Sequence, residues 1–166
     1  AINARLLMMV RLNKNRMNYL EQFQKMIDEY NSGSANVEQF FNELVEFAKT
    51  LNEEERRGVA EGLNEEELTL FDILTKPDMT LTQAQARDIK KVAKELIETL
   101  KREKLVLDWR KKQQSRANVR ICIENILDKL PQIYTRDIYS QKCDYVYQHV
   151  YDSYYGEGRS VYARAG

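Results

Sequence analysis

The sequence has a single histidine, two cysteines, six glycines and two prolines among its 166 residues. Because the chain has only one histidine, we expect neither a serine–histidine or cysteine–histidine catalytic pair nor most forms of acid–base catalysis that depend on a group titrating near neutral pH. Cys143 and His149 are six residues apart on an expected helix, so their side chains face different directions and do not predict a zinc site. No phosphate-binding loop of the pattern GxxxxGK[ST] occurs. We therefore expect no catalytic residue, no metal ligand and no cofactor in this chain.

Long apolar runs are also missing. No apolar stretch is long enough to cross a bilayer, so we expect no membrane span. Cys122 and Cys143 lie among apolar neighbours, where a thiol behaves as a small hydrophobic group, which favours reduced cysteines and a cytoplasmic location. A bridge between the two stays open. The first residues, "AINARLLMMV", lack an initiating Met and read like the middle of a helix, which indicates a fragment of a longer chain.

The zero net charge is the sum of two unlike halves. Residues 1–80 carry 9 Lys and Arg against 15 Asp and Glu, whereas residues 81–166 carry 17 against 11. This asymmetry indicates either a polyanionic or acidic partner for the basic half, or two halves of one molecule that attract each other. The composition alone leaves both interpretations open.

Helix start signals recur along the chain and strand-like alternation is absent, which predicts an all-α fold, an irregular bundle of six or seven helices. Asn36 with Gln39, and Thr82 with Gln85, have the spacing of helix-capping pairs. We expect one helical domain over 1–155, with a candidate sub-boundary near 76–82, and a flexible tail over 156–166. The expected helices are 3–30, one after Asn36, two short acidic ones after Asn52 and Asn64, a long basic one after Thr82, then 109–130 and 136–155.

The segment "LDWRKKQQSRANVR" (107–120) combines an aromatic residue with many cations. Counting back from Ile123 and Leu127 in helical steps, the core stripe of this expected helix runs directly into basic residues. Such cations can neutralise phosphates or carboxylates of a partner. The alternative is a solvated face with the tryptophan tucked under its neighbours. The candidate contacts to DNA or a partner are Trp109, Arg110, Lys111, Lys112, Arg116 and Arg120.

Tyrosines are concentrated near the C-terminal end. They fall on several faces of the expected helix 136–155, so they cannot all point into one core. Tyrosine is enriched at protein interfaces because it offers a large rigid surface with a polar tip, although ordinary half-buried packing is the alternative. The candidate partner contacts are Tyr139, Tyr145, Tyr147, Tyr151 and Tyr154.

Several blocks of the sequence resemble the C-terminal helical region of the motor (R) subunit of type I restriction–modification enzymes. The main blocks are "KLVLDWRKKQQSRANVRICIENILDKLP" and "YTRDIYSQKCDYVYQHVYDSYYG". Upstream, "RMNYLEQFQKMIDEYN", "LNEEERRGVAEGLNEEELTLFDILTKPD" and "VAKELIETLKREKLVLDW" follow in the same order, so the resemblance covers about residues 5–156.

The resemblance implies a parent subunit that is an ATP-dependent, DNA-translocating site-specific deoxyribonuclease, whose other domains bind ATP and Mg²⁺. It implies that the helical region attaches the motor to the methyltransferase, meaning its M subunit or its M and S subunits, and to the remainder of the R subunit. No catalytic residue carries over to this chain. Our main hypothesis is therefore a non-catalytic assembly module, and the alternative is a direct non-specific duplex-DNA contact by the basic helices 87–120.

Overall fold

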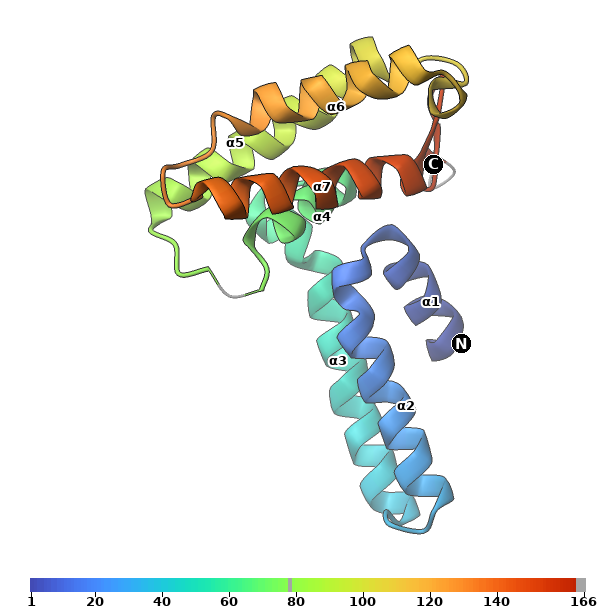
Figure 1. The fold of residues 1–166 in the computed structure, drawn as a ribbon. Coiled ribbons are helices and arrows are strands. Elements are labelled where there is room, and N and C mark those ends of the chain that lie inside the picture. The colour runs from blue at the N-terminus through green and yellow to red at the C-terminus, as the bar shows by residue number, and fades with distance from the viewer. Residues whose placement is uncertain (78, 164–166) are drawn as a thin grey trace. The chain divides into compact units, whose positions relative to one another are not determined.

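The computed structural model describes residues 1–77 and 79–163 (Figure 1). Over these residues the chain forms seven α-helices and one short hairpin, which confirms the all-α prediction. Two compact units can be distinguished, Ala1–Asn64 (unit 1) and Glu65–Gly166 (unit 2). The division falls at Asn64 rather than near residues 76–82, where the sequence suggested a sub-boundary. No described helix combines the length and the apolar character that a membrane span requires.

Unit 1 consists of three helices around an apolar cluster. They are α1 (Ile2–Leu12), α2 (Met17–Asn31) and α3 (Val37–Glu61), with a 3-10 turn, Lys14–Arg16, between α1 and α2. The expectation of one continuous helix over 3–30 is wrong. Asn13 has an extended backbone, with φ −149° and ψ 102°, and its side chain accepts a hydrogen bond from the Asn15 amide. The chain reverses there because Leu6 and Met9 of α1 and Phe23 and Met26 of α2 bury against the same cluster.

The α3 helix is longer than the sequence predicted. Its start is as expected, because the Asn36 side chain accepts from the Gln39 amide, and Gly62 ends it with a φ of 72°. The prediction of a separate acidic helix after Asn52 is wrong. The Asn52 side chain accepts from the Arg5 guanidinium instead of capping a new helix, and Leu51 is fully buried in an uninterrupted α3.

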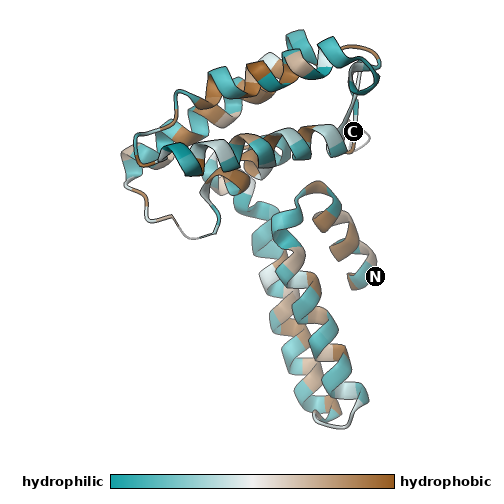
Figure 2. Ribbon diagram, in the orientation of Figure 1, coloured by the Kyte–Doolittle hydropathy of each residue, from teal (hydrophilic) through white to brown (hydrophobic). Residues whose placement is uncertain are grey.

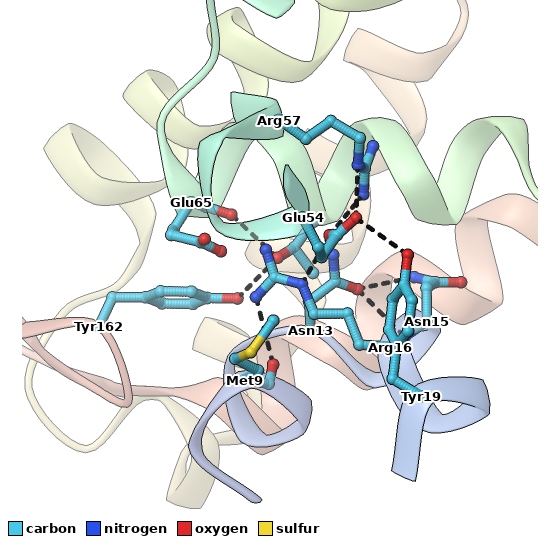
Figure 3. A network of polar contacts seen from close by, with 10 residues as sticks. Met9, Asn13, Asn15, Arg16, Tyr19, Glu54, Arg57, Glu65 and Tyr162 are labelled. Atoms are coloured by element: carbon cyan, nitrogen blue, oxygen red, sulfur yellow. Dashed lines mark hydrogen bonds and ion pairs between the residues drawn. The ribbon is translucent and has the colours of Figure 1, made fainter. Parts of the chain in front are cut away.

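A buried ionic network joins the helices of unit 1, and Figure 3 shows its side chains directed at the Glu54 carboxylate. Arg16 Nε lies 2.9 Å from Glu54 Oε2, and Arg57 Nε lies 2.8 Å from Glu54 Oε1. The Arg16 guanidinium also donates to the Met9 carbonyl, and Tyr19 Oη donates to the carboxylate. Burial alone would raise the pKa of Glu54, but hydrogen bonds from the two arginines outweigh burial and lower it.

Unit 2 packs four helices in the predicted order. They are α4 (Glu65–Thr75), α5 (Gln83–Thr99) with a π-helical turn (Leu100–Lys104), α6 (Gln113–Leu127) and α7 (Arg136–Ser153). The Thr82 and Gln85 side chains form the expected capping box at the start of α5. The α4 helix contacts both α5 and α7, and α6 contacts α5 and α7. Figure 2 shows hydrophilic and hydrophobic residues alternating along the helices, as expected when each buries one face.

Two parts of unit 2 differ from the prediction. The helix expected over 109–130 begins only at Gln113, and Trp109–Lys111 form a 3-10 turn after Asp108, whose φ is 56°. Residues 156–163, expected to belong to a flexible tail, instead continue a hairpin of β1 (Tyr154–Gly156) and β2 (Arg159–Ser160), followed by the buried Val161 and Tyr162. Residues 164–166 of the predicted tail lie outside the described residues.

Candidate partner-binding surface

The loop 106–112 is held by a tryptophan that points into unit 2. The Trp109 side chain is fully buried. Its ring makes edge contacts with Tyr147 and Tyr151, at centroid distances of 6.4 and 5.9 Å, and its Nε1 donates to the Tyr154 carbonyl at 3.1 Å. Trp109 therefore fixes the loop from behind, which matches the alternative that the sequence left open, with the tryptophan under its neighbours.

The C-terminal hairpin holds the same loop from a second side. Gly156 has a φ of 100°, and a Cβ at this position would lie 2.4 Å from the Val106 carbonyl oxygen. The next residue, Glu157, donates its amide to the Leu105 carbonyl at 3.0 Å. Sequence reasoning missed this hairpin, although Gly156 and Gly158 are spaced as turn residues and could have signalled it.

Two of the predicted contact arginines are used within unit 2. The Arg110 guanidinium lies over the rings of Tyr151 and Tyr155, 5.4 and 4.9 Å from their centroids, and donates to the Tyr151 carbonyl at 3.1 Å. Arg116 donates to the Arg110 carbonyl at 2.7 Å. These contacts join the loop to α6 and α7, because cation–π pairs and hydrogen bonds to carbonyl groups constrain both side chains.

Arg120 is also paired. Its guanidinium lies 2.7 Å from Asp144 Oδ1 and 3.2 Å from Glu124 Oε2, and 5.9 Å from the Tyr147 ring centroid. Burial would lower the pKa of Arg120, but its hydrogen bonds with Asp144 and Glu124 raise it overall, so the cation stays charged. Arg120 therefore links α6 to α7.

Lys111 and Lys112 are the predicted cations that face solvent. The Lys111 side chain is 82% exposed, and its Nζ lies 3.9 Å from Asp108 Oδ1, a weak surface pair. Lys112 is exposed as well. Beside them, Val106 and Leu107 are 44% and 45% exposed. We call these four exposed side chains the 106–112 surface: Val106, Leu107, Lys111 and Lys112.

Most of the predicted tyrosines are occupied by internal contacts. Tyr139 Oη donates to the Glu124 carbonyl at 2.8 Å, and Tyr154, only 3% exposed, donates to Glu66 at 2.9 Å. Burial, with the nearby Glu66 carboxylate, raises the pKa of Tyr154 strongly. Among the five candidates Tyr145 is the most open, at 48% exposure.

The remaining chemistry-bearing groups are dispersed. In the part of the chain that the structure describes, no three His, Cys, Asp or Glu side chains are grouped closely enough to hold a metal ion. His149 Nδ1 lies 3.3 Å from Ser153 Oγ on the same helix. Cys122 and Cys143 are free thiols, and burial raises the pKa of both.

Comparison with known proteins places this arrangement in a family. Residues 1–153 match a family model described as "Type I restriction enzyme HindI endonuclease subunit-like, C-terminal". The chain belongs to this family. The match includes the whole 106–112 surface and α7, and it ends just before the hairpin.

Two curated relatives carry names of the same kind. A Methanocaldococcus jannaschii protein named as a type I restriction enzyme MjaIXP endonuclease subunit is 29% identical over 124 residues, covering 72% of this chain and 12% of the relative. The type I restriction enzyme HindI endonuclease subunit of Haemophilus influenzae is 26% identical over 108 residues, covering 65% of this chain and 10% of the relative. The chain therefore spans about a tenth of the length of these relatives. No solved structure matches it.

Proposed function

We propose that this chain is a non-catalytic assembly module of a type I restriction endonuclease subunit. In this role it docks the DNA-translocating and nuclease parts of the subunit onto the methyltransferase, through its M subunit or its M and S subunits, in the cytoplasm. ATP and Mg²⁺ would then be bound by other domains of the same subunit. The chain belongs to a family of type I endonuclease subunits, which implies that it acts within a multisubunit complex, and this supports the proposal.

The observation that carries the proposal is the 106–112 surface. Val106 and Leu107 expose apolar side chains next to two solvent-facing lysines, an arrangement similar to an interface with an apolar centre and a charged rim. The backbone behind these side chains is already held by Trp109 and by the close approach of Gly156. A loop that is ordered before binding loses less conformational entropy on binding. Because a stable association between separate proteins buries roughly 800 Å² on each partner, the 106–112 surface would be the apolar centre of a larger interface with the methyltransferase.

Co-sedimentation of the chain with purified methyltransferase tests the proposal, with and without a duplex containing the recognition site, at low and moderate salt. We expect comigration without DNA. Leu107→Asp should weaken the affinity for methyltransferase at least tenfold, because the substitution places a carboxylate at the apolar centre of the 106–112 surface. Absence of comigration at high micromolar concentration would contradict docking.

A charge-reversed pair of variants provides the matched control. Lys111→Glu removes a cation from the proposed surface, whereas Lys25→Glu removes one from α2 in unit 1. Both side chains are about equally exposed, at 82% and 77%, and each lies 3.9 Å from an acidic oxygen on its own segment. The two changes should therefore have a similar effect on the stability of the fold. Only Lys111 belongs to the 106–112 surface, so only Lys111→Glu should weaken methyltransferase binding. Equal effects of the two variants would mean that net charge, rather than this surface, controls the association.

Direct contact with duplex DNA by the basic helices 87–120 is a second candidate function. Exposed cations in this region, several of them on α5, favour this function. Two of the exposed cations, Lys101 and Arg102, form ion pairs within unit 2. This function predicts an affinity that falls steeply with salt, because bound phosphates release counterions. Comigration that requires the duplex and disappears with salt would support DNA contact over docking. The exposed cations are Arg87, Lys91, Lys94, Lys101, Arg102, Lys111 and Lys112.

A further inference from the structure

The α3 helix of unit 1 carries two apolar stripes. The first contains Phe47 and Leu51 and is buried in the core cluster. The second consists of Val37, Phe41 and Val45, which are 67%, 61% and 39% exposed. Residues four apart on a helix lie on the same side, so these three side chains form one continuous exposed strip. A row of exposed apolar side chains of this kind indicates a surface that another element covers.

The α1 helix already covers the far end of the same side of α3. Two short connections join α1 to α2 and α2 to α3, so α1 and α3 run in the same direction. Arg5 of α1 donates to Asn52 and binds Glu55 at 2.7 Å, which aligns α1 with the C-terminal half of α3. Val37 precedes Asn52 by about 22 Å of helix, at 1.5 Å per residue. In Figure 1 the paired helices α2 and α3 continue well beyond the first residue of α1.

Towards its C-terminal end, the α2 helix also carries incompletely buried apolar side chains. Ile27 is only partly buried against the core cluster. Tyr30, near the end of the helix, is 39% exposed and stacks on Phe40 of α3, with 4.6 Å between the ring centroids. Beyond α1, both helices therefore continue to expose apolar groups that a third helix could cover.

We propose that the strip Val37, Phe41 and Val45 binds a helical segment of the same subunit, the one that leads directly into α1. A helix continued upstream from Ile2 by about ten residues would pass Val45, Phe41 and Val37 in turn. The family model describes a C-terminal region, and the relatives are about ten times longer than their matched parts, so subunits of this kind contain a long polypeptide ahead of this region. The inference rests on family membership and is independent of docking to the methyltransferase.

The size of the strip favours a segment of the same chain over a separate molecule. A stable association between separate proteins buries roughly 800 Å² on each partner, far more than three side chains supply. A segment already joined to α1 has a high effective concentration next to the strip, so a small contact is enough to hold it. The segment should also show helical periodicity, with apolar residues at about three or four, seven and eleven positions before Ile2. An upstream sequence without that pattern would overturn the proposal.

Photo-crosslinking in the complete subunit identifies the occupant directly. Phe41 is replaced by p-benzoylphenylalanine, which keeps an aromatic side chain at that position. The expected product joins residue 41 to a peptide immediately before Ala1. As the matched control, the same group is placed at Glu46, whose side chain is 74% exposed and five residues away on another side of α3. Crosslinking of residue 41 to a second copy or to a methyltransferase subunit would overturn the proposal in favour of that partner.

Thiol labelling measures the coverage without a crosslink. We expect the thiol of Phe41→Cys to react with a maleimide at least tenfold more slowly than that of Glu46→Cys in the complete subunit. The native Cys122 and Cys143 contribute little background, because both are buried and burial raises the pKa of each thiol. Equal labelling rates at the two positions would show that the strip is open and would refute the proposal. Slow labelling only after methyltransferase is added would assign the strip to the partner instead.

Discussion

Replacing Gly156 by alanine tests how firmly the hairpin holds the loop that carries the 106–112 surface. A Cβ at this position would lie 2.4 Å from the Val106 carbonyl oxygen and 3.4 Å from the Asp108 amide nitrogen. Both atoms belong to the backbone, so they cannot move aside as a flexible side chain would. The φ of 100° adds a second cost, because a residue with a Cβ rarely adopts it.

The expected loss of stability follows from these two costs. The left-handed conformation destabilises alanine by about 1–2 kcal/mol, and relief of the overlap by shifting the loop or the hairpin costs about 1–3 kcal/mol more. Gly158→Ala is the matched control, since Gly158 has a φ of 76° and no atom within 4 Å of its Cβ position. We therefore expect about 2–5 kcal/mol for Gly156→Ala and about 1–2 kcal/mol for Gly158→Ala.

Urea unfolding followed by tryptophan fluorescence measures this difference. Trp109 is the one tryptophan of the sequence, and its indole donates to the carbonyl of Tyr154 in the hairpin, so its emission reports on this part of unit 2. Gly156→Ala should also weaken methyltransferase binding, because the exposed loop shifts with its support. If the two alanine variants lose the same free energy of unfolding, the close approach to Val106 does not hold the loop, and the reasoning is refuted.

Three further predictions concern the buried groups. Glu54→Gln should lower the free energy of unfolding of unit 1 by about 3 kcal/mol, because it removes the carboxylate that pairs with the buried Arg16. The control Glu55→Gln, at the surface, should lower it by less than about 1 kcal/mol. Urea unfolding followed by circular dichroism compares the two variants. Folding lowers the pKa of Glu54, so its stabilisation is fully present above the unfolded pKa of about 4.3 and is lost as the pH falls through the folded pKa. The stability difference between the wild type and Glu54→Gln should therefore begin to shrink below about pH 4.3 and should close only below the folded pKa, and curves that stay parallel would contradict this. Trp109→Ala should destabilise unit 2 by about 3–5 kcal/mol, measured by thermal unfolding, while a loss below about 1 kcal/mol would contradict the burial of its indole.

Part of the candidate site could be predicted from the sequence. The segment around residue 109 was identified because cations interrupt an apolar stripe, and Lys111 and Lys112 do face solvent. Val106 and Leu107 were missed, because apolar residues next to a core stripe normally predict burial. Their exposure results from the left-handed backbone of Asp108 and the 3-10 turn that follows it, which no helical count anticipates.

The sequence by itself determined the features that depend on neighbours within one or two helical turns. The caps at Asn36 and Thr82 form as their spacing predicts, because donor and acceptor are three residues apart. Only the tertiary structure decided which polar side chains are buried. Arg16 meets Glu54, 38 residues away, and Arg110 meets the Tyr151 carbonyl, 41 residues away. A cation leaves water only where distant segments supply its partners, so a local pattern shows that it is charged but cannot show whether it faces a partner protein or the core of its own fold.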